Sequence, residues 1–304
     1  MKIVSLLPSA TEIVYALGLE DSLQGVTYEC DFPEAARGKP VISNTALPRE
    51  ELGSSGAIDA AVREKMEARQ PIYLLDRERI REIQPDLILA QDLCRVCAVP
   101  SGQVEEALDE LGCTSQVLSL DPSSVDEIID GIAEVGRATG RDDRARQLVE
   151  GLRARVEVVR SAAEPLPRVR TFAIEWLDPP FVGGHWVPEM VRLAGGQHLL
   201  NAERAPSRVA SRSDIVRAGP EVVVFMPCGY GLEEAIAEAK LLLANEGFAT
   251  TPAARGGAVF AVDATSYFSR PGPRIVDGLE ILAWILHPEA FPEPGEGRAV
   301  RVVA

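Results

Sequence analysis

Two distant stretches of the sequence share one pattern. Residues 79–89 read RIREIQPDLIL, and residues 214–224 read DIVRAGPEVVV. In each stretch a helical pattern ends before a proline (Pro85 or Pro220), an acidic residue follows, and an apolar run begins. Proline ends a helix, and a short aliphatic run bounded by turn residues predicts a buried strand. The repeat therefore predicts two similar α/β lobes.

The start of the chain shows the same alternation of strand and helix. Residues 2–7 form a mostly apolar run, and a helical pattern from about 10–17 ends at Gly18. Short apolar strands alternating with amphipathic helices are typical of βα units that build a parallel sheet. The predicted fold class is α/β, with a Rossmann-like arrangement around a central sheet in each lobe.

The chain divides into three parts by this reading. We expect an N-terminal α/β lobe over residues 1–121, in which residues 49–73 look like an insertion. Residues 122–165 form a helical region, and residues 166–304 form the C-terminal lobe.

The helical region carries its own signals. Ser124 and Glu127 have the spacing of a capping box at a helix start. After an interruption at Gly140, apolar residues continue at helical spacing from about Arg141 to Ala163. We expect this second piece to be a single long helix that joins the two lobes.

Composition excludes several classes of protein. The 304 residues carry 46 acidic and 31 basic side chains, a net charge of −15. Proteins that bind nucleic acid present basic surfaces, so this balance argues against a nucleic-acid partner. No run approaches the roughly 18 consecutive apolar residues of a membrane-spanning helix.

The first residues do not have the pattern of a secretory signal. The apolar run over residues 3–7 stops at Pro8, and neither a small-residue cleavage site nor a lipid-attachment cysteine follows. We therefore expect a cytoplasmic protein, or an extracytoplasmic one if an export signal has been removed.

The number of cysteines indicates their oxidation state. Five cysteines are an odd number, which favours free thiols in a reducing compartment over a disulfide framework. Cys94 and Cys97 form a CxxC motif after the strand predicted at 87–90, and Cys228 follows the corresponding strand of the other lobe. Thiolates there would suit a soft metal or an axial cobalt or iron ligand. A thiol redox pair and plain packing residues are the alternatives.

Several motifs, taken in order along the chain, resemble one family. They are LPSATE at 7–12, GVTY at 25–28 with DFP at 31–33, DPPF at 178–181 and YFSRPGPR at 267–274. Together with two α/β lobes and one long connecting helix, they resemble the class III, helical-backbone periplasmic substrate-binding proteins. The resemblance is strongest to the cobalamin-binding, metal-chelate members.

This resemblance implies a binding protein and not an enzyme, with no catalytic residues or catalytic cofactor. The expected ligand is a corrinoid such as cobalamin, held between the lobes during uptake or intracellular handling. Haem or a ferric siderophore is the alternative ligand. Few basic residues are expected near these loops, which favours a corrinoid over an anionic siderophore. A second alternative is a thiol-based metal or redox protein that uses Cys94 and Cys97 on the same scaffold.

The candidate ligand-binding residues follow the predicted strands. Ligands of open α/β sheets bind beyond the carboxyl ends of the strands, and aromatic side chains suit a flat macrocycle. A metal could be held by Cys94 and Cys97. The candidate ligand-binding residues are Pro8, Ser9, Tyr28, Cys94, Cys97, Glu175, Trp176, Phe181, Cys228, Ser266, Tyr267 and Phe268.

The resemblance also implies a partner. Family members involved in transport dock to an ABC-type permease through one acidic residue on each lobe. Glu78 matches the first position, whereas Ser213 occupies the second with Asp214 beside it. We therefore expect Glu78 and Asp214 to be the docking residues if a permease partner exists. Among the histidines, only His185 lies near a candidate ligand loop.

Overall fold

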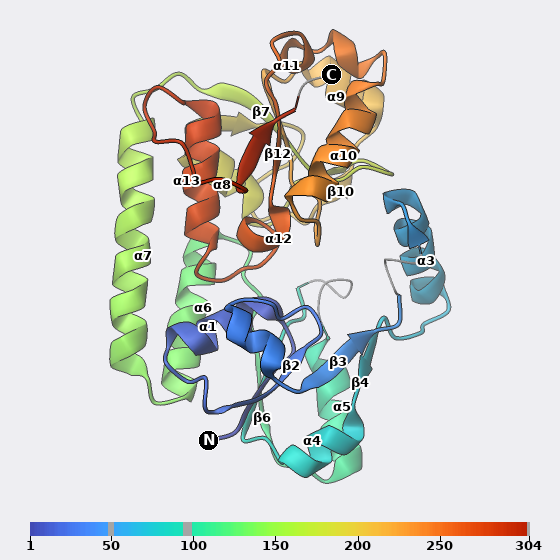
Figure 1. Ribbon diagram of the computed structural model, residues 1–304, viewed down its shortest axis with the longest axis vertical. Helices are drawn as coiled ribbons and strands as arrows, with labels where there is room; N and C mark the ends of the chain where they lie inside the picture. The colour runs from blue at the N-terminus through green and yellow to red at the C-terminus, as the bar shows by residue number, and fades with distance from the viewer. Residues whose placement is uncertain (48–51, 94–98, 303–304) are drawn as a thin grey trace. The chain divides into compact units, whose positions relative to one another are not determined.

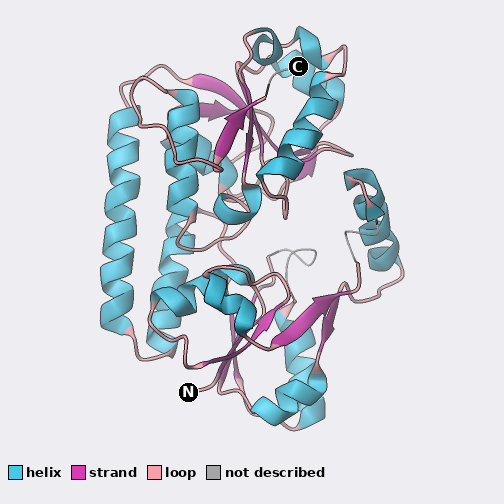
Figure 2. Ribbon diagram, viewed as in Figure 1, coloured by secondary structure: helices cyan, strands magenta, loops and turns pink. Residues whose placement is uncertain are grey.

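The computed structural model describes residues 1–47, 52–93 and 99–302, which form two compact units (Figures 1 and 2). Each unit has its own central sheet with helices packed on it. The prediction of two α/β lobes is therefore confirmed. Unit 1 comprises Met1–Pro122 and Asp130–Val149, and unit 2 comprises Ser123–Ile129 and Glu150–Ala304.

Unit 1 is built on a six-stranded sheet in the order β4-β3-β2-β1-β5-β6. All neighbouring strands are parallel except β3 and β4, which are antiparallel. Apolar side chains of β1, β3 and β5 pack in one core with those of α4 and α5. The strands are β1 (Ile3–Ser5), β2 (Leu23–Thr27), β3 (Val41–Thr45), β4 (Tyr73–Leu75), β5 (Leu87–Ala90) and β6 (Gln116–Ser119).

The helices of unit 1 include one in the predicted insertion. The segment over residues 49–73 contains α3, which begins at Ser55. The Ser54 hydroxyl accepts a hydrogen bond from the Ala57 backbone N–H and caps it. Among the described residues, the helices whose bounds lie wholly in unit 1 are α1 (Pro8–Ala16), η1 (Glu34–Gly38), α3 (Ser55–Glu67), α4 (Arg77–Ile83) and α5 (Ser101–Leu111).

Unit 2 has a seven-stranded sheet in the order β10-β8-β7-β11-β12-β13, and β9 also pairs with β7. The central strands β7, β11 and β12 are parallel, and antiparallel strands lie at both edges. The strands are β7 (Val169–Trp176), β8 (Phe181–Val182), β9 (Gly196–His198), β10 (Arg208–Val209), β11 (Val222–Phe225), β12 (Val259–Val262) and β13 (Ala299–Arg301).

The helices of unit 2 bury the sheet. Apolar side chains of β7, β11 and β12 form one core with residues of α9, α10, η2 and α11, while α8 and α13 pack against each other. The helices are α8 (Val187–Leu193), α9 (Arg212–Ala218), α10 (Leu232–Leu243), η2 (Phe248–Thr250), α11 (Pro252–Arg255), α12 (Ala264–Tyr267) and α13 (Ile275–Leu286).

The repeated proline–acid pattern has the same structural role in both units. The Asp86 carboxylate accepts a hydrogen bond from the Lys2 backbone N–H at 2.6 Å, and the Asp86 N–H donates to the Lys2 carbonyl at 2.9 Å. In unit 2, Glu221 makes the same two bonds with Arg170, both at 2.8 Å. The acidic residue therefore fastens the start of a strand to the first strand of its sheet, which fixes their pairing.

Two further helices contain residues of both units. They are α6 (Val125–Ala138), whose first turn belongs to unit 2, and α7 (Asp142–Ala163), whose last part does. Within unit 1 they approach closely at Gly136, where a Cβ atom would lie 2.4 Å from Cβ of Ala145. The long helix predicted over 141–163 is confirmed by α7, but the chain also passes between units within α6.

No helix among the described residues is both long and apolar enough to span a membrane.

Candidate functional site

The carboxyl ends of β7, β11 and β12 meet at one edge of the unit 2 sheet, because these neighbouring strands are parallel. The segments that follow them are joined by backbone hydrogen bonds. The Cys228 N–H donates to the Glu175 carbonyl at 3.0 Å, and the Thr265 N–H donates to the Tyr230 carbonyl at 3.1 Å. We call these segments, residues 175–177, 227–230 and 263–268, the carboxyl edge of unit 2.

Aromatic side chains gather at the carboxyl edge. The rings of Trp176 and Tyr230 pack edge to face, with centroids 5.4 Å apart and planes at 62°. Both the Trp176 side chain and that of Tyr267, at the end of α12, are partly buried. Sequence reasoning missed Tyr230, although it follows a strand and lies between two glycines, a position typical of a ligand loop.

The two other predicted aromatic residues, Phe268 and Phe181, differ in burial. Phe268 is 2% exposed, and its carbonyl accepts a hydrogen bond from Nε1 of the buried Trp186 at 2.9 Å. Phe181 lies in β8 and is partly buried. The bond to Trp186 fixes the backbone immediately after Tyr267 and so helps to place that ring.

Glu175 has both carboxyl oxygens engaged within the protein. The Gly184 N–H donates to Oε1 at 3.1 Å, and the Ser207 hydroxyl donates to Oε2. Burial raises the pKa of Glu175 to about 7, the nearby Cys228 thiol adds to the rise, and the two hydrogen bonds oppose it. Near neutral pH the carboxyl group is therefore close to half protonated.

Two arginines lie near the Tyr267 ring. The guanidinium carbons of Arg274 and Arg298 are 5.8 Å and 5.2 Å from its centroid, within the range of a cation–π contact. Ser266 donates its backbone N–H to Oδ1 of Asp263, which caps α12. Basic groups are thus present at this loop, so the expected scarcity of basic residues is not an argument against an anionic ligand.

The candidate residues of unit 1 lie at the carboxyl ends of its first two strands. Pro8 and Ser9 begin α1, since the proline ring suits the first turn of a helix, and both residues are buried. Tyr28 follows β2 and is 37% exposed, and its backbone N–H donates to the Ser43 carbonyl at 3.0 Å.

The predicted thiol site cannot be placed, because Cys94 and Cys97 lie outside the described residues. Of the cysteines that are described, Cys30, Cys113 and Cys228 all carry thiols, and Cys228 is partly buried at the carboxyl edge of unit 2. Within the described ranges, no group of three or more His, Cys, Asp or Glu side chains is placed to hold a metal ion. The metal role of Cys94 and Cys97 stays a prediction.

Comparison with known proteins identifies the family. Residues 3–265 match the family model described as periplasmic binding protein. The chain belongs to the periplasmic binding protein family. It is 27% identical to a vitamin B12-binding protein of Yersinia pestis over 226 residues, which cover 73% of this chain and 68% of the relative. It is 24% identical over 294 residues to an ABC transporter substrate-binding lipoprotein of Bacillus subtilis, over 96% of this chain and 82% of that one.

The fold of this periplasmic binding protein is also found among solved structures. A periplasmic haem-binding protein from Pseudomonas aeruginosa superposes with a TM-score of 0.73 at 21% identity, over 100% of this chain and 99% of the other. The expected resemblance to substrate-binding proteins is thereby confirmed.

The expectation of a cytoplasmic protein is wrong. The family acts in the periplasm, and the Bacillus subtilis relative is a lipoprotein. The pattern of the first residues of a folded domain does not report its compartment. The free thiols do not indicate the compartment either, since Cys30 and Cys113 are buried and need no reducing environment to remain free of a disulfide.

The two predicted docking residues are placed at equivalent helix starts. Glu78 is exposed in the first turn of α4, which Asp76 caps through the Arg79 N–H at 3.0 Å. Asp214 lies in the first turn of α9, where it accepts a hydrogen bond from the Ser211 hydroxyl at 2.7 Å. That bond lowers the pKa of Asp214, so it carries a negative charge at neutral pH.

His185 has an unusual backbone and is partly buried. Its φ is +51°, and its N–H donates to the Ala205 carbonyl at 2.6 Å. Burial lowers the pKa of His185, so the ring is neutral at physiological pH. His185 therefore helps to hold the segment that contains Ala205.

Proposed function

We propose that this periplasmic binding protein binds a metal tetrapyrrole of the corrinoid type, without catalysing a reaction, and that the carboxyl edge of unit 2 supplies one face of its site. Two arguments support the proposal. The family binds solutes, and one relative is a vitamin B12-binding protein. The carboxyl edge carries the Trp176–Tyr230 pair and Tyr267, whose apolar faces and polar tips suit a flat macrocycle with polar substituents.

The observation that carries the proposal is the edge-to-face packing of Trp176 and Tyr230. Each ring restrains the other at a centroid distance of 5.4 Å, so a ligand that contacts Trp176 meets a preformed surface. A preformed surface loses less side-chain entropy when the ligand binds, which favours affinity. Haem is the alternative ligand, because a haem-binding protein has the same fold and Arg274 and Arg298 could pair with its propionates.

Calorimetric titration with cyanocobalamin and with haemin tests the proposal. We expect the wild-type protein to bind cyanocobalamin with a Kd in the micromolar range or below, and more tightly than haemin. Trp176→Ala should remove about 1–3 kcal/mol of binding free energy, roughly a fivefold to 150-fold rise in Kd.

Trp284→Ala is the matched control. Trp284 lies in α13 and packs against Phe260 of β12, with ring centroids 6.0 Å apart. The Trp284→Ala substitution removes an indole from the same unit without altering the carboxyl edge. No binding of either tetrapyrrole by folded wild-type protein would contradict the proposal, and so would equal losses in the two variants.

We further propose that the loaded protein delivers its ligand to an ABC-type permease through Glu78 and Asp214. The substrate-binding lipoprotein among the relatives and the charges at two equivalent helix starts support this. Glu78→Gln combined with Asp214→Asn should leave the Kd for cyanocobalamin unchanged and abolish ligand-dependent stimulation of the permease's ATP hydrolysis in liposomes. Undiminished stimulation would exclude these two residues.

A further inference from the structure

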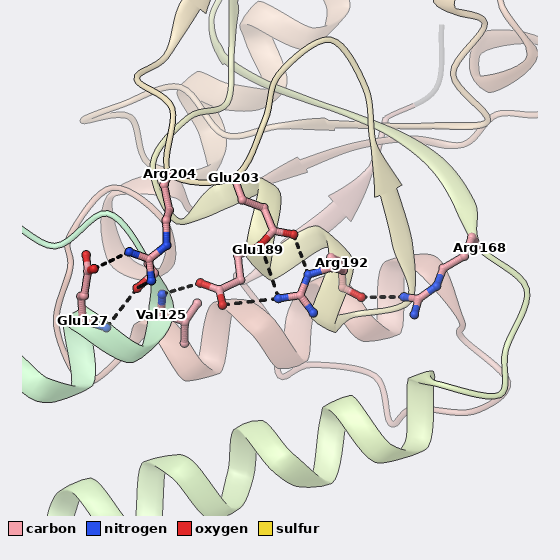
Figure 3. Close-up of polar contacts among 8 residues, drawn as sticks. Val125, Glu127, Arg168, Glu189, Arg192, Glu203 and Arg204 are labelled. Atoms are coloured by element: carbon pink, nitrogen blue, oxygen red, sulfur yellow. Dashed lines mark hydrogen bonds and ion pairs between the residues drawn. The ribbon is translucent and has the colours of Figure 1, made fainter.

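The first turn of α6 is attached to the rest of unit 2 by a polar cluster (Figure 3). Arg204 donates through Nη1 to Oε1 of Glu127 at 2.6 Å and through Nη2 to Oγ of Ser124 at 3.3 Å. Glu189 accepts from the Val125 N–H at 2.7 Å. Several polar contacts on one short helical segment, rather than an apolar face alone, fix its position.

Two further ion pairs support this attachment. Arg192 bridges Glu189 at 3.4 Å and Glu203 at 2.6 Å (Figure 3). Burial raises the pKa of Glu189, and the positive charge of Arg192 opposes that rise. The residue before Arg204 is therefore also tied to the Glu189 side chain that holds α6.

Arg204 lies in the segment Asn201–Ser207, which is fastened to the segment Gly183–His185. The Arg204 N–H donates to the His185 carbonyl at 3.0 Å, and Nδ2 of Asn201 donates to the Gly183 carbonyl at 3.0 Å. At Gly184 the two backbones touch, because a Cβ atom there would lie 2.2 Å from the Ser207 nitrogen. The contacts of Arg204 and Asn201 therefore hold the two segments together on either side of the place where Gly184 meets Ser207.

Ser207 and Gly184 are the two hydrogen-bond donors to the Glu175 carboxyl group at the carboxyl edge. We propose that Arg204 is a positioning residue of this edge: by attaching the segment Asn201–Ser207 to the first turn of α6, it holds Ser207 and Gly184 against Glu175. The inference rests on the proposed function only for what the edge binds.

The link runs to a helix that both units share. The first turn of α6 belongs to unit 2 and its remainder to unit 1. Arg204 therefore joins a shared helix to Glu175, the residue that precedes Trp176. Loss of the contacts between Arg204 and the first turn of α6 would let water reach the Glu175 carboxyl group.

The pKa of Glu175 shows whether the Arg204 contacts hold the segment in place, because solvation favours the charged form of the carboxyl group. The groups that act on it are the Ser207 hydroxyl, the Gly184 N–H and the Cys228 thiol. If Arg204 holds the segment in place, its removal should lower the pKa of Glu175 from about 7 toward its ordinary 4.5. Loss of the Ser207 and Gly184 bonds alone would raise the pKa, but the water that enters donates in their place and removes the desolvation, which is the largest cause of the raised value. A residue that only added stability would not shift this titration.

The test is a carbon-13 NMR titration of the full chain labelled at the glutamate carboxyl carbons, with the Glu175 signal assigned by its loss in Glu175→Gln. In Arg204→Ala we expect the pKa to fall by about 1 unit or more as water reaches the carboxyl group. Arg204→Lys keeps the positive charge near Glu127, so the pKa of Glu175 should fall less in this variant than in Arg204→Ala. Arg217→Ala is the matched control, because it breaks an ion pair with Asp214 on an exposed helix of the same unit.

The inference is overturned if the pKa of Glu175 is the same in folded Arg204→Ala and in the wild type, or if Arg217→Ala lowers it equally. Glu127→Ala removes the acceptor on α6 and decides the question in the same way if Arg204→Ala does not fold. Cyanocobalamin titrations of the same variants give the second readout, with weaker binding expected in Arg204→Ala only. If the wild type binds no tetrapyrrole, the proposed function fails while the NMR titration still decides the role of Arg204.

Discussion

Replacing Glu175 by Gln should make the protein more stable above neutral pH and much less so in mild acid. Gln has the shape of the protonated carboxyl group: its amide oxygen can accept from the Gly184 N–H, and its amide N–H can donate to the Ser207 hydroxyl. The substitution therefore removes the titration of residue 175 while keeping both hydrogen bonds.

The size of the effect follows from the pKa of Glu175, which burial raises from 4.5 to about 7. A raised carboxyl pKa means that the unfolded chain releases its proton at lower pH than the folded protein. The protonated Glu175 carboxyl group thus contributes its full amount to the free energy of unfolding of the wild type below about pH 4.5. This contribution is lost as the pH rises to about 7, at 1.36 kcal/mol per pH unit, or about 3 kcal/mol in total. About 1 kcal/mol is lost by about pH 5, and nearly all by about pH 7.5.

Urea denaturation of both proteins at the two pH values measures this effect. The free energy of unfolding of Glu175→Gln minus that of the wild type should grow by about 2 kcal/mol between about pH 5 and pH 7.5. Other titrating groups are shared by the two proteins and cancel in the difference. A difference that does not change with pH, or that falls as the pH rises, would refute the reasoning.

Three further changes test other parts of the structure. Gly136→Ala should lower the free energy of unfolding by about 1–3 kcal/mol, because the new methyl group would lie 2.4 Å from Cβ of Ala145. Gly151→Ala in α7 places its methyl group in open space and should not lower it, and denaturant unfolding compares the two variants. Glu221→Ala should cost about 1 kcal/mol in the same assay, because the Arg170 N–H loses its carboxylate, and an unchanged midpoint would remove the role given to the repeat. Burial lowers the pKa of His198 to about 4, so folded protein resists protonation and should lose about 2 kcal/mol as the pH falls from about 7 to about 5. His198→Gln should abolish that loss in thermal or urea unfolding, and an equal loss in the variant would contradict the assignment.

The features that local pattern determines were predictable from the sequence. Pro85 and Pro220 mark the same turn in both units, because a proline ends a helix wherever it stands. The capping prediction at Ser124 and Glu127 is confirmed in part: the Ser124 hydroxyl accepts from the Glu127 N–H at 3.2 Å, but the Glu127 carboxylate accepts from Ser123 instead.

Features that depend on distant contacts were not predictable. Arg204 contacts a helix turn 77 residues earlier in the chain, and no spacing rule connects the two. The engagement of Glu175 by Gly184 and Ser207 likewise depends on how β8 and β10 approach β7. Tyr230 is different, since its place after β11 was visible and only its partnership with Trp176 was not.

Hydrogen exchange measured by mass spectrometry, with and without cyanocobalamin, shows whether a corrinoid binds at the carboxyl edge of unit 2. The ligand should slow exchange in peptides that cover the carboxyl edge of unit 2, namely residues 175–177, 227–230 and 263–268, and leave α10 and η2 unchanged. Haemin and a ferric hydroxamate serve as comparison ligands at the same concentration. Protection by cyanocobalamin confined to other parts of unit 2, or none at a concentration well above the Kd, would contradict the account.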